Sequence, residues 1–137
     1  MKYLLDTDIC VYWLKEDERI EQTAISVGLG NIAISFMTLS ELYYGAYKSQ
    51  HVKENPAAIN LLVGKLSVIE SSDQICVRFG NLKADLEKQG MIIDDADLFI
   101  AASALTTGST LVTNNTRHFK RIEELQLQNW SRYATEI

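Results

Sequence analysis

Proline, glycine and cysteine are scarce in this sequence, and each shortage excludes a class of protein. The 137 residues include one proline and seven glycines, which excludes collagen-like chains and Pro- or Gly-rich low-complexity chains. The two cysteines, Cys10 and Cys76, lie far apart and lack CxxC spacing, so neither a zinc site nor a disulfide is expected. Both lie among apolar residues, and both are predicted to be buried thiols.

Histidines, long apolar runs and net positive charge are also lacking. With only His51 and His118 in the chain, a multi-histidine metal centre is excluded. No apolar run is long enough to span a membrane, and Asp6 comes too early for a signal-peptide apolar region, so we expect a cytoplasmic protein with no membrane partner. The net charge of −5 argues against holding nucleic acid by bulk positive charge. It does not exclude a nucleic-acid enzyme whose acids surround a metal ion.

The sequence does contain the pattern of an α/β protein. Hydrophobic residues make up 47% and charged residues 23%, a balance typical of globular proteins, and we predict a single domain over residues 1–137. Short apolar runs alternate with helical patterns, which predicts a three-layer α/β/α sandwich with a mainly parallel central sheet. The predicted strands are residues 3–5, 32–35, 66–70, 110–113 and 125–127, the last at an edge. The predicted helices are residues 8–14, 20–27, 36–47, 56–65, 71–89 and 94–105.

The first predicted strand stops abruptly at Asp6, Thr7 and Asp8. In open α/β sheets, sites form outside the carboxyl ends of strands. Aspartate is also a good helix N-cap. We therefore predict that Asp8 caps the next helix and that Asp6 is functional.

The second predicted strand leads to Glu41, which has two interpretations. Thr38 and Glu41 have the T-x-x-E spacing of a capping box, in which the carboxylate would fold back on the Thr38 amide. Alternatively, Glu41 lies in the first turn of a helix that starts at the carboxyl end of a strand, and it points into the same crevice as Asp6.

Asp97 lies near the start of a small, almost wholly apolar helix. Its neighbours Asp94 and Asp95 suit the positive end of the helix dipole. Asp97 lies inside the helix, with no further polar side chain before Ser103. A carboxylate in such a position needs a partner, and a bound cation is the simplest one.

The fourth predicted strand, residues 110–113, ends at Thr113 and is followed by Asn114 and Asn115. Four segments thus bring three carboxylates and two amides to one crevice, a donor set that suits Mg²⁺ or Mn²⁺. Without a metal, crowded carboxylates raise each other's pKa. A metal held in this way activates water and stabilises charge on a phosphate. No Ser/His or Cys/His arrangement and no P-loop is visible.

Four motifs carry a resemblance to a known family. They are Leu4-Leu5-Asp6-Thr7-Asp8, Thr38-Leu39-Ser40-Glu41-Leu42-Tyr43-Tyr44-Gly45, Asp97-Leu98-Phe99-Ile100-Ala101-Ala102 and Leu111-Val112-Thr113-Asn114-Asn115. In this order and spacing the sequence resembles the PIN-domain ribonucleases, specifically the VapC toxins of type II toxin–antitoxin systems. The resemblance implies a metal-dependent RNA endonuclease whose acidic, catalytic metal site is formed by Asp6, Glu41 and Asp97.

The same resemblance implies partners and one departure from the family pattern. It implies a homodimer that is neutralised by a VapB-like antitoxin, whose peptide segment enters the acidic cleft, and an RNA substrate that in several members is transfer RNA. The family often has a further acid after the fourth strand. Here Asn115 stands at that position, with His118 close by, and either could take its place.

The resulting hypothesis is a Mg²⁺-dependent RNA endonuclease, with Mn²⁺ as a possible substitute. Asp6 and Asp97 hold one metal, Glu41 binds or orients it through water, and Asn115 is a weaker ligand candidate. Thr7, Thr38 and Thr113 are predicted to orient these ligands. The nearest basic side chains either orient a phosphate backbone or form an ordinary solvated patch; they are Arg117, Lys120 and Arg121.

Two other classes of function remain open from the sequence. One is a doubly wound phosphatase or phosphotransferase, with Asp6 as nucleophile and Asp8 as its acid. That reaction needs a lysine near a later strand end, and none is well placed. The other is a non-catalytic module that only binds a partner protein.

Overall fold

All the strands of the structure run parallel in one five-stranded sheet, in the order β3–β2–β1–β4–β5. The structure is a computed structural model that describes residues 2–48 and 55–134, so His51 lies outside the described residues. The strands are β1 (Tyr3–Leu5), β2 (Ile32–Ser35), β3 (Ser67–Ile69), β4 (Thr110–Val112) and β5 (Leu127–Gln128). The predicted parallel sheet is confirmed. The edge strand starts two residues later and ends one residue later than predicted.

The helices are α1 (Thr7–Leu14), α2 (Glu18–Val27), the 3₁₀ turn η1 (Leu29–Asn31), α3 (Phe36–Lys48), α4 (Asn55–Val63), α5 (Asp73–Lys88), α6 (Asp95–Thr107) and α7 (Thr116–Phe119). The six predicted helices are present in the predicted order, whereas the 3₁₀ turn η1 and the short helix α7 were not predicted. None of these described helices has both the length and the apolar character needed to cross a membrane.

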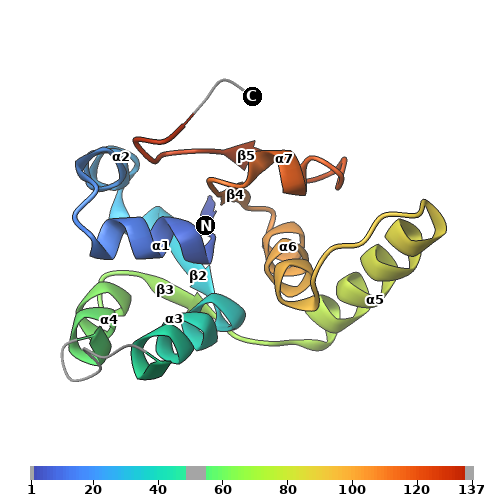
Figure 1. Cartoon of the computed structure of the whole chain (residues 1–137), viewed down its shortest axis with the longest axis horizontal. Helices are drawn as coiled ribbons and strands as arrows, with labels where there is room; N and C mark the ends of the chain where they lie inside the picture. Colours follow the sequence, from blue (N-terminus) through green and yellow to red (C-terminus); the bar gives the residue numbers. More distant parts are fainter. Residues whose placement is uncertain (1, 49–54, 135–137) are drawn as a thin grey trace.

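The helices form two layers, one on each face of the sheet. Successive strand side chains point to opposite faces, so Leu4 packs into one hydrophobic core and Leu5 into the other. The buried helical residues of the Leu4 core come from α5, α6 and α7, and those of the Leu5 core come from α1 to α4. Figure 1 shows α1 and α4 on one side of the central strands and α5 and α6 on the other. The predicted three-layer α/β/α sandwich is confirmed.

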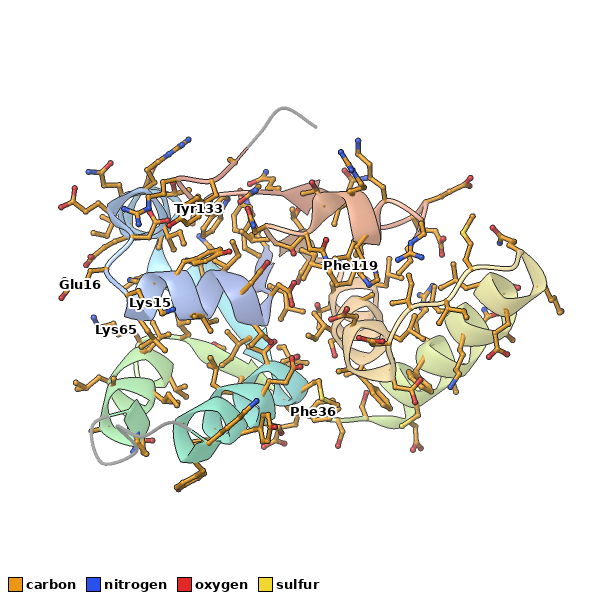
Figure 2. All side chains as sticks on the ribbon, viewed as in Figure 1. Lys15, Glu16, Phe36, Lys65, Phe119 and Tyr133 are labelled. Carbon is orange, nitrogen blue, oxygen red and sulfur yellow. The ribbon has the colours of Figure 1, made fainter. Side chains whose placement is uncertain are left out.

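An aromatic ladder crosses from α3 to α5 beside the carboxyl edge of the sheet. The ring of Phe36 meets the edge of the Phe99 ring on α6 at 5.9 Å, and Phe99 stacks on Phe79 of α5 at 4.0 Å between ring centroids. Figure 2 shows Phe36 at the start of α3, on the side that faces α6. The ladder holds the start of α3 close to α6, the two helices that carry Glu41 and Asp97.

The C-terminal segment is tied back to the first two helices. Asp17 is buried, caps α2 and accepts a hydrogen bond from the Arg132 N–H (3.1 Å). Tyr133 lies over α1 (Figure 2), with its ring 5.2 Å from the Tyr12 ring. The tail therefore stabilises the α1 side of the sheet, where the predicted site lies.

One of the two cysteine predictions is wrong. Cys10, on α1, is fully buried as expected, and burial raises the pKa of its thiol. Cys76, on α5, is exposed. It lies beside the apolar stripe of its helix but on the solvent side of it, a distinction that neighbouring residues in the sequence do not reveal.

Candidate active site

The carboxyl ends of β1, β2 and β4 meet at one edge of the sheet. Leu5 of β1 is in register with Ile34 of β2 and Val112 of β4, so the residues that follow these strands emerge side by side. The Asp6 N–H donates to the Val112 carbonyl (2.8 Å), which fixes the start of α1 against β4.

Asp6 lies at this edge with only 6% of its surface exposed. Its Oδ1 accepts a hydrogen bond from the Thr7 N–H (2.8 Å), and its Oδ2 accepts one from the Thr113 hydroxyl (2.7 Å). Burial, reinforced by the nearby Asp8 carboxylate, raises the pKa of Asp6 to about 7, although both hydrogen bonds act in the opposite direction. With this pKa only about half of the Asp6 carboxyl groups are ionised at neutral pH, and a positive partner would favour the charged form.

Asp8 is the residue that the sequence prediction misplaced. Asp6, not Asp8, is the N-cap of α1, because the helix starts directly at the end of β1. Asp8 lies in the first turn, where its Oδ2 accepts the Asn114 N–H (3.1 Å) while its Oδ1 is buried with no hydrogen-bond partner. Burial raises the pKa of Asp8 to about 6. The spacing of Asp6 and Asp8, two residues apart directly after a strand, is the sequence feature that could have predicted a second acid in the same crevice.

Glu41 contacts the first residue of α1. It lies in the second turn of α3 and not in the first turn as predicted, because the helix begins at Phe36. Its Oε1 accepts a hydrogen bond from the Thr7 hydroxyl (2.6 Å), and the hydroxyls of Thr7 and Thr38 are 3.2 Å apart. The capping-box alternative is wrong because α3 begins at Phe36, and the Thr38 N–H donates to the Ser35 hydroxyl instead (3.0 Å). Thr7 and Thr38 lie beside Glu41, and Thr113 lies beside Asp6, in positions that can orient both carboxylates.

Asp97 faces the same crevice from the first turn of α6. It has a protein partner that the sequence analysis did not identify: the Oδ2 of Asp97 is 3.1 Å from the Nε2 of His118 on α7. Burial raises the pKa of Asp97, and the interaction with His118 lowers it in part. His118 was predicted only as a substitute for a missing acid. Its contact with Asp97 is not visible in the sequence because 21 residues separate the two side chains.

These acids line one pocket of about 420 Å³. Its lining residues are Asp6, Thr7, Asp8, Val11, Tyr12, Glu41, Asp97 and Asn115. A larger cavity of about 520 Å³ is lined by α5 and Thr106, with one acid, Asp73, and one base, Arg78. The smaller pocket is the candidate site, since four carboxylates converge there and none of its lining residues is basic.

The pocket suits a hard cation better than it suits any other ligand type. Its donors are carboxylate oxygens, which Mg²⁺ and Mn²⁺ prefer, and the unpartnered Oδ1 of Asp8 and the raised pKa values of Asp6 and Asp8 all indicate missing positive charge. Among residues 2–48 and 55–134, no three Asp, Glu, His or Cys side chains already form a group that could hold one metal ion. An ion that keeps several water ligands, as Mg²⁺ does, needs only one or two carboxylates as direct ligands.

The remaining predicted residues lie at the rim, in or beside α7. Asn115 lines the pocket, is exposed, and precedes α7 as its N-cap. Arg117 and Lys120 are exposed. Arg121 is engaged inside the protein, donating to the carbonyls of His118 and Ile92 (3.0 Å each). Its role in orienting RNA stays a prediction.

Comparisons with known proteins agree with this architecture. The PIN domain family model matches residues 3–125. Ribonuclease VapC2 of Haemophilus influenzae is 38% identical over 130 residues, covering 95% of this chain and 98% of that protein. The tRNA(fMet)-specific endonuclease VapC of Shigella flexneri is 35% identical over 131 residues, covering 96% and 99%. Among solved structures, VapBC2 from Rickettsia felis, bound to a DNA fragment from its promoter, matches with a TM-score of 0.90 and 38% identity, covering 96% of this chain and 100% of that one.

Proposed function

Because the chain belongs to the PIN-domain family, and within it to the VapC group, we propose that it is an RNA endonuclease that acts with a divalent cation. The observation that carries the proposal is the pocket into which four carboxylates converge. Asp6 and Asp8 follow β1, Glu41 lies on the helix that follows β2, and Asp97 lies at the start of α6. Similar proteins named ribonuclease or endonuclease support the same reaction class.

The proposed cation is Mg²⁺, with Mn²⁺ as an alternative, and the ligands are Asp6 and Asp97, with Glu41 acting through water. When bound, the ion supplies an activated water and stabilises the charge that develops on the phosphodiester. Asp8 adds negative charge through its unpartnered Oδ1. Asn115, at the rim, can offer an amide oxygen but no charge.

The chain's own hydroxyls hold these carboxylates in place. The Thr113 hydroxyl donates to Asp6, and the Thr7 hydroxyl donates to Glu41. Because these hydrogen bonds orient the two carboxylates in advance, the carboxylates lose less conformational freedom when an ion binds. Thr113, in the short loop after β4, thus helps to orient the Asp6 carboxylate.

The proposed substrate is a structured RNA, with transfer RNA as the first candidate because a 35% identical relative carries that substrate in its name. Arg117 and Lys120 are exposed beside Asn115 at the rim of the pocket. We assign them the role of orienting the RNA phosphates, which fix position rather than sequence.

The proposed partners are a VapB-like antitoxin and a second copy of the chain. Similar chains have been solved as VapBC pairs. In this chain a groove of about 390 Å³ between α1, α3 and α4 adjoins the acidic pocket, since Val11 and Glu41 line both. A segment of antitoxin that occupied this mostly apolar groove would end at the carboxylates, so a basic side chain there would offset their charge.

Gly45 offers a test of the antitoxin proposal. It lines the groove, and a Cβ at this position meets no atom within 4 Å. Gly45→Trp is expected to weaken binding of the antitoxin, measured by titration calorimetry. Gly80→Trp on α5 is the matched control, since its Cβ also meets nothing within 4 Å and it lies away from the groove. Equal affinity in the two variants would place the antitoxin elsewhere.

The nuclease itself is tested with total cellular RNA and synthetic transfer RNA. Wild type, Asp6→Asn and Asp97→Asn, each freed of partner, are incubated with Mg²⁺ or EDTA, and the fragments are sequenced. Asp85→Asn, on the exposed side of α5, is the control. Discrete cuts that require metal, persist in the control and vanish in the site variants support the proposal.

The two alternative functions are outcomes of the same experiment. No lining residue of the pocket is a lysine, and the comparisons favour neither alternative. A trapped phospho-Asp6 with no RNA cleavage would replace the nuclease by a phosphotransferase. Absence of cleavage with every metal tried, from a folded protein, would leave a partner-binding module.

A further inference from the structure

Three side chains from separate segments form a continuous hydrogen-bonded chain at the edge of the pocket. Arg121 donates from Nε to the His118 carbonyl and from one terminal nitrogen to the Ile92 carbonyl, both at 3.0 Å. Its other terminal nitrogen lies against Nδ1 of the His118 ring. The opposite nitrogen of that ring, Nε2, meets Oδ2 of Asp97 at 3.1 Å. The guanidinium is therefore held by three contacts, one of which is with the His118 ring on the side opposite Asp97.

The chemistry of arginine decides which ring nitrogen carries the proton. A guanidinium has only donors and stays protonated in proteins, so the Nδ1 that faces Arg121 has to accept. A proton on that nitrogen would set two donors against each other. The proton of the neutral imidazole consequently lies on Nε2, which donates to the Asp97 carboxylate.

We infer that Arg121 and His118 are positioning residues for Asp97: Arg121 fixes the His118 tautomer, and His118 then holds Oδ2 of Asp97 and leaves Oδ1 for a divalent cation. The inference rests on the proposed metal-dependent nuclease and deepens it by assigning what orients one metal ligand. Residues that orient metal ligands through such hydrogen bonds commonly change metal affinity by about 10- to 100-fold.

Removal of Arg121 is expected to change cation affinity in the direction opposite to the one that its charge alone predicts. Arg121 carries a positive charge one side chain away from Asp97. If Arg121 acted only through its charge, its removal would strengthen binding of a cation at Asp97. If it acts by fixing His118, its removal weakens binding, because Asp97 loses a directed donor and its carboxylate is free to rotate.

The first arm of the test measures the tautomer in the metal-free protein. A long-range ¹H–¹⁵N correlation spectrum distinguishes the protonated from the unprotonated ring nitrogen of each histidine. The chain has two histidines, so the same spectrum of His51→Gln assigns the signals of His118. We expect a single neutral tautomer with the proton on Nε2. A proton on Nδ1, or on both nitrogens, in the folded protein at pH 8 would overturn the inference.

The second arm measures Mn²⁺ affinity by electron paramagnetic resonance in matched variants. Arg121→Met and Arg117→Met each remove one positive charge from α7 or the residues just after it, but Arg117 is exposed and forms no part of the chain of bonds. Arg121→Met is expected to bind Mn²⁺ about 10-fold more weakly than Arg117→Met. His118→Leu is expected to bind Mn²⁺ similarly weakly, and His118→Gln, whose amide can donate in place of Nε2, is expected to recover most of the affinity. Equal or tighter binding by Arg121→Met would overturn the inference.

The two proposals fail in different ways. Metal-dependent RNA cleavage by a wild type whose His118 carries its proton on Nδ1 removes the positioning role and leaves the nuclease. A wild type with the expected tautomer that cuts no RNA under any metal removes the nuclease, while the tautomer itself, read without metal, stands.

Discussion

Replacing Asp6 by Asn should make the metal-free protein more stable at pH 8 and less stable at pH 4. In the folded protein the pKa of Asp6 is raised from 3.8 to about 7, chiefly by burial and then by Asp8. A raised carboxyl pKa means that the folded state holds its proton more tightly than the unfolded state. The contribution of Asp6 to the free energy of unfolding is therefore highest below pH 4 and falls as pH rises toward about 7.

The magnitude follows from the size of the shift. One pKa unit corresponds to 1.36 kcal/mol, so a rise from 3.8 to about 7 corresponds to about 4 kcal/mol lost by wild type between pH 4 and pH 8. Asn keeps the N-cap acceptor for the Thr7 N–H but leaves the Thr113 hydroxyl without its acceptor, which costs about 1 kcal/mol. The variant should thus be less stable by about 1 kcal/mol at pH 4 and more stable by about 3 kcal/mol at pH 8.

Urea denaturation in EDTA across pH 4 to 8 measures the crossing directly, with Asp85→Asn as the control for removal of an acid. Addition of Mg²⁺ should stabilise wild type at pH 8, since an ion that binds only the folded state adds free energy of unfolding, and should stabilise Asp6→Asn much less. The reasoning is refuted if Asp6→Asn is less stable than wild type by the same amount at both pH values. That result would mean that Asp6 is charged in the folded protein without a cation.

Four further substitutions test other parts of the structure. Thr113→Val removes the donor to Asp6 and should lower Mn²⁺ affinity about 10-fold in the same resonance titration; unchanged affinity would show that the hydroxyl does not orient Asp6. Gly45→Ala and Gly80→Ala, both helical with open space at the Cβ, should each raise the free energy of unfolding by about 0.5–1 kcal/mol in urea, and a loss at either would mean that its surroundings are tighter than the structure shows. Leu111→Ala, at a fully buried position of β4, should lower it by about 2–5 kcal/mol, whereas a loss below about 1 kcal/mol would place Leu111 outside the core.

Local sequence patterns determined the strands and the acids that follow them. Leu4 and Leu5 are both apolar because each points into a different core, and a run without polar alternation is the mark of such a strand. Glycines and caps at the helix ends are local signals as well. These short-range features placed Asp6 and Asp97 at the start of helices and Glu41 on the helix that follows β2. The general rule for α/β sheets then predicted that the three acids share one edge.

Tertiary structure decided which of these side chains touch. The bond between Asp6 and Thr113 joins residues 107 positions apart, and it exists because β4 is the neighbour of β1 in the sheet. The contact between Asp97 and His118 depends in the same way on α7 docking beside α6. No periodicity encodes such pairings, since they result from the packing of whole elements.

The placement of Asp8 and the role of Arg121 show the same division. The sequence by itself determined that two acids follow β1, but whether Asp6 or Asp8 capped the helix depended on where α1 begins against the sheet. It also determined that Arg121 is basic, while only the folded chain directs the guanidinium to the carbonyls of His118 and Ile92. Composition and periodicity fix what each segment is, because they act over a few residues; the contacts of charged side chains are fixed by the tertiary structure, because their partners arrive from distant segments.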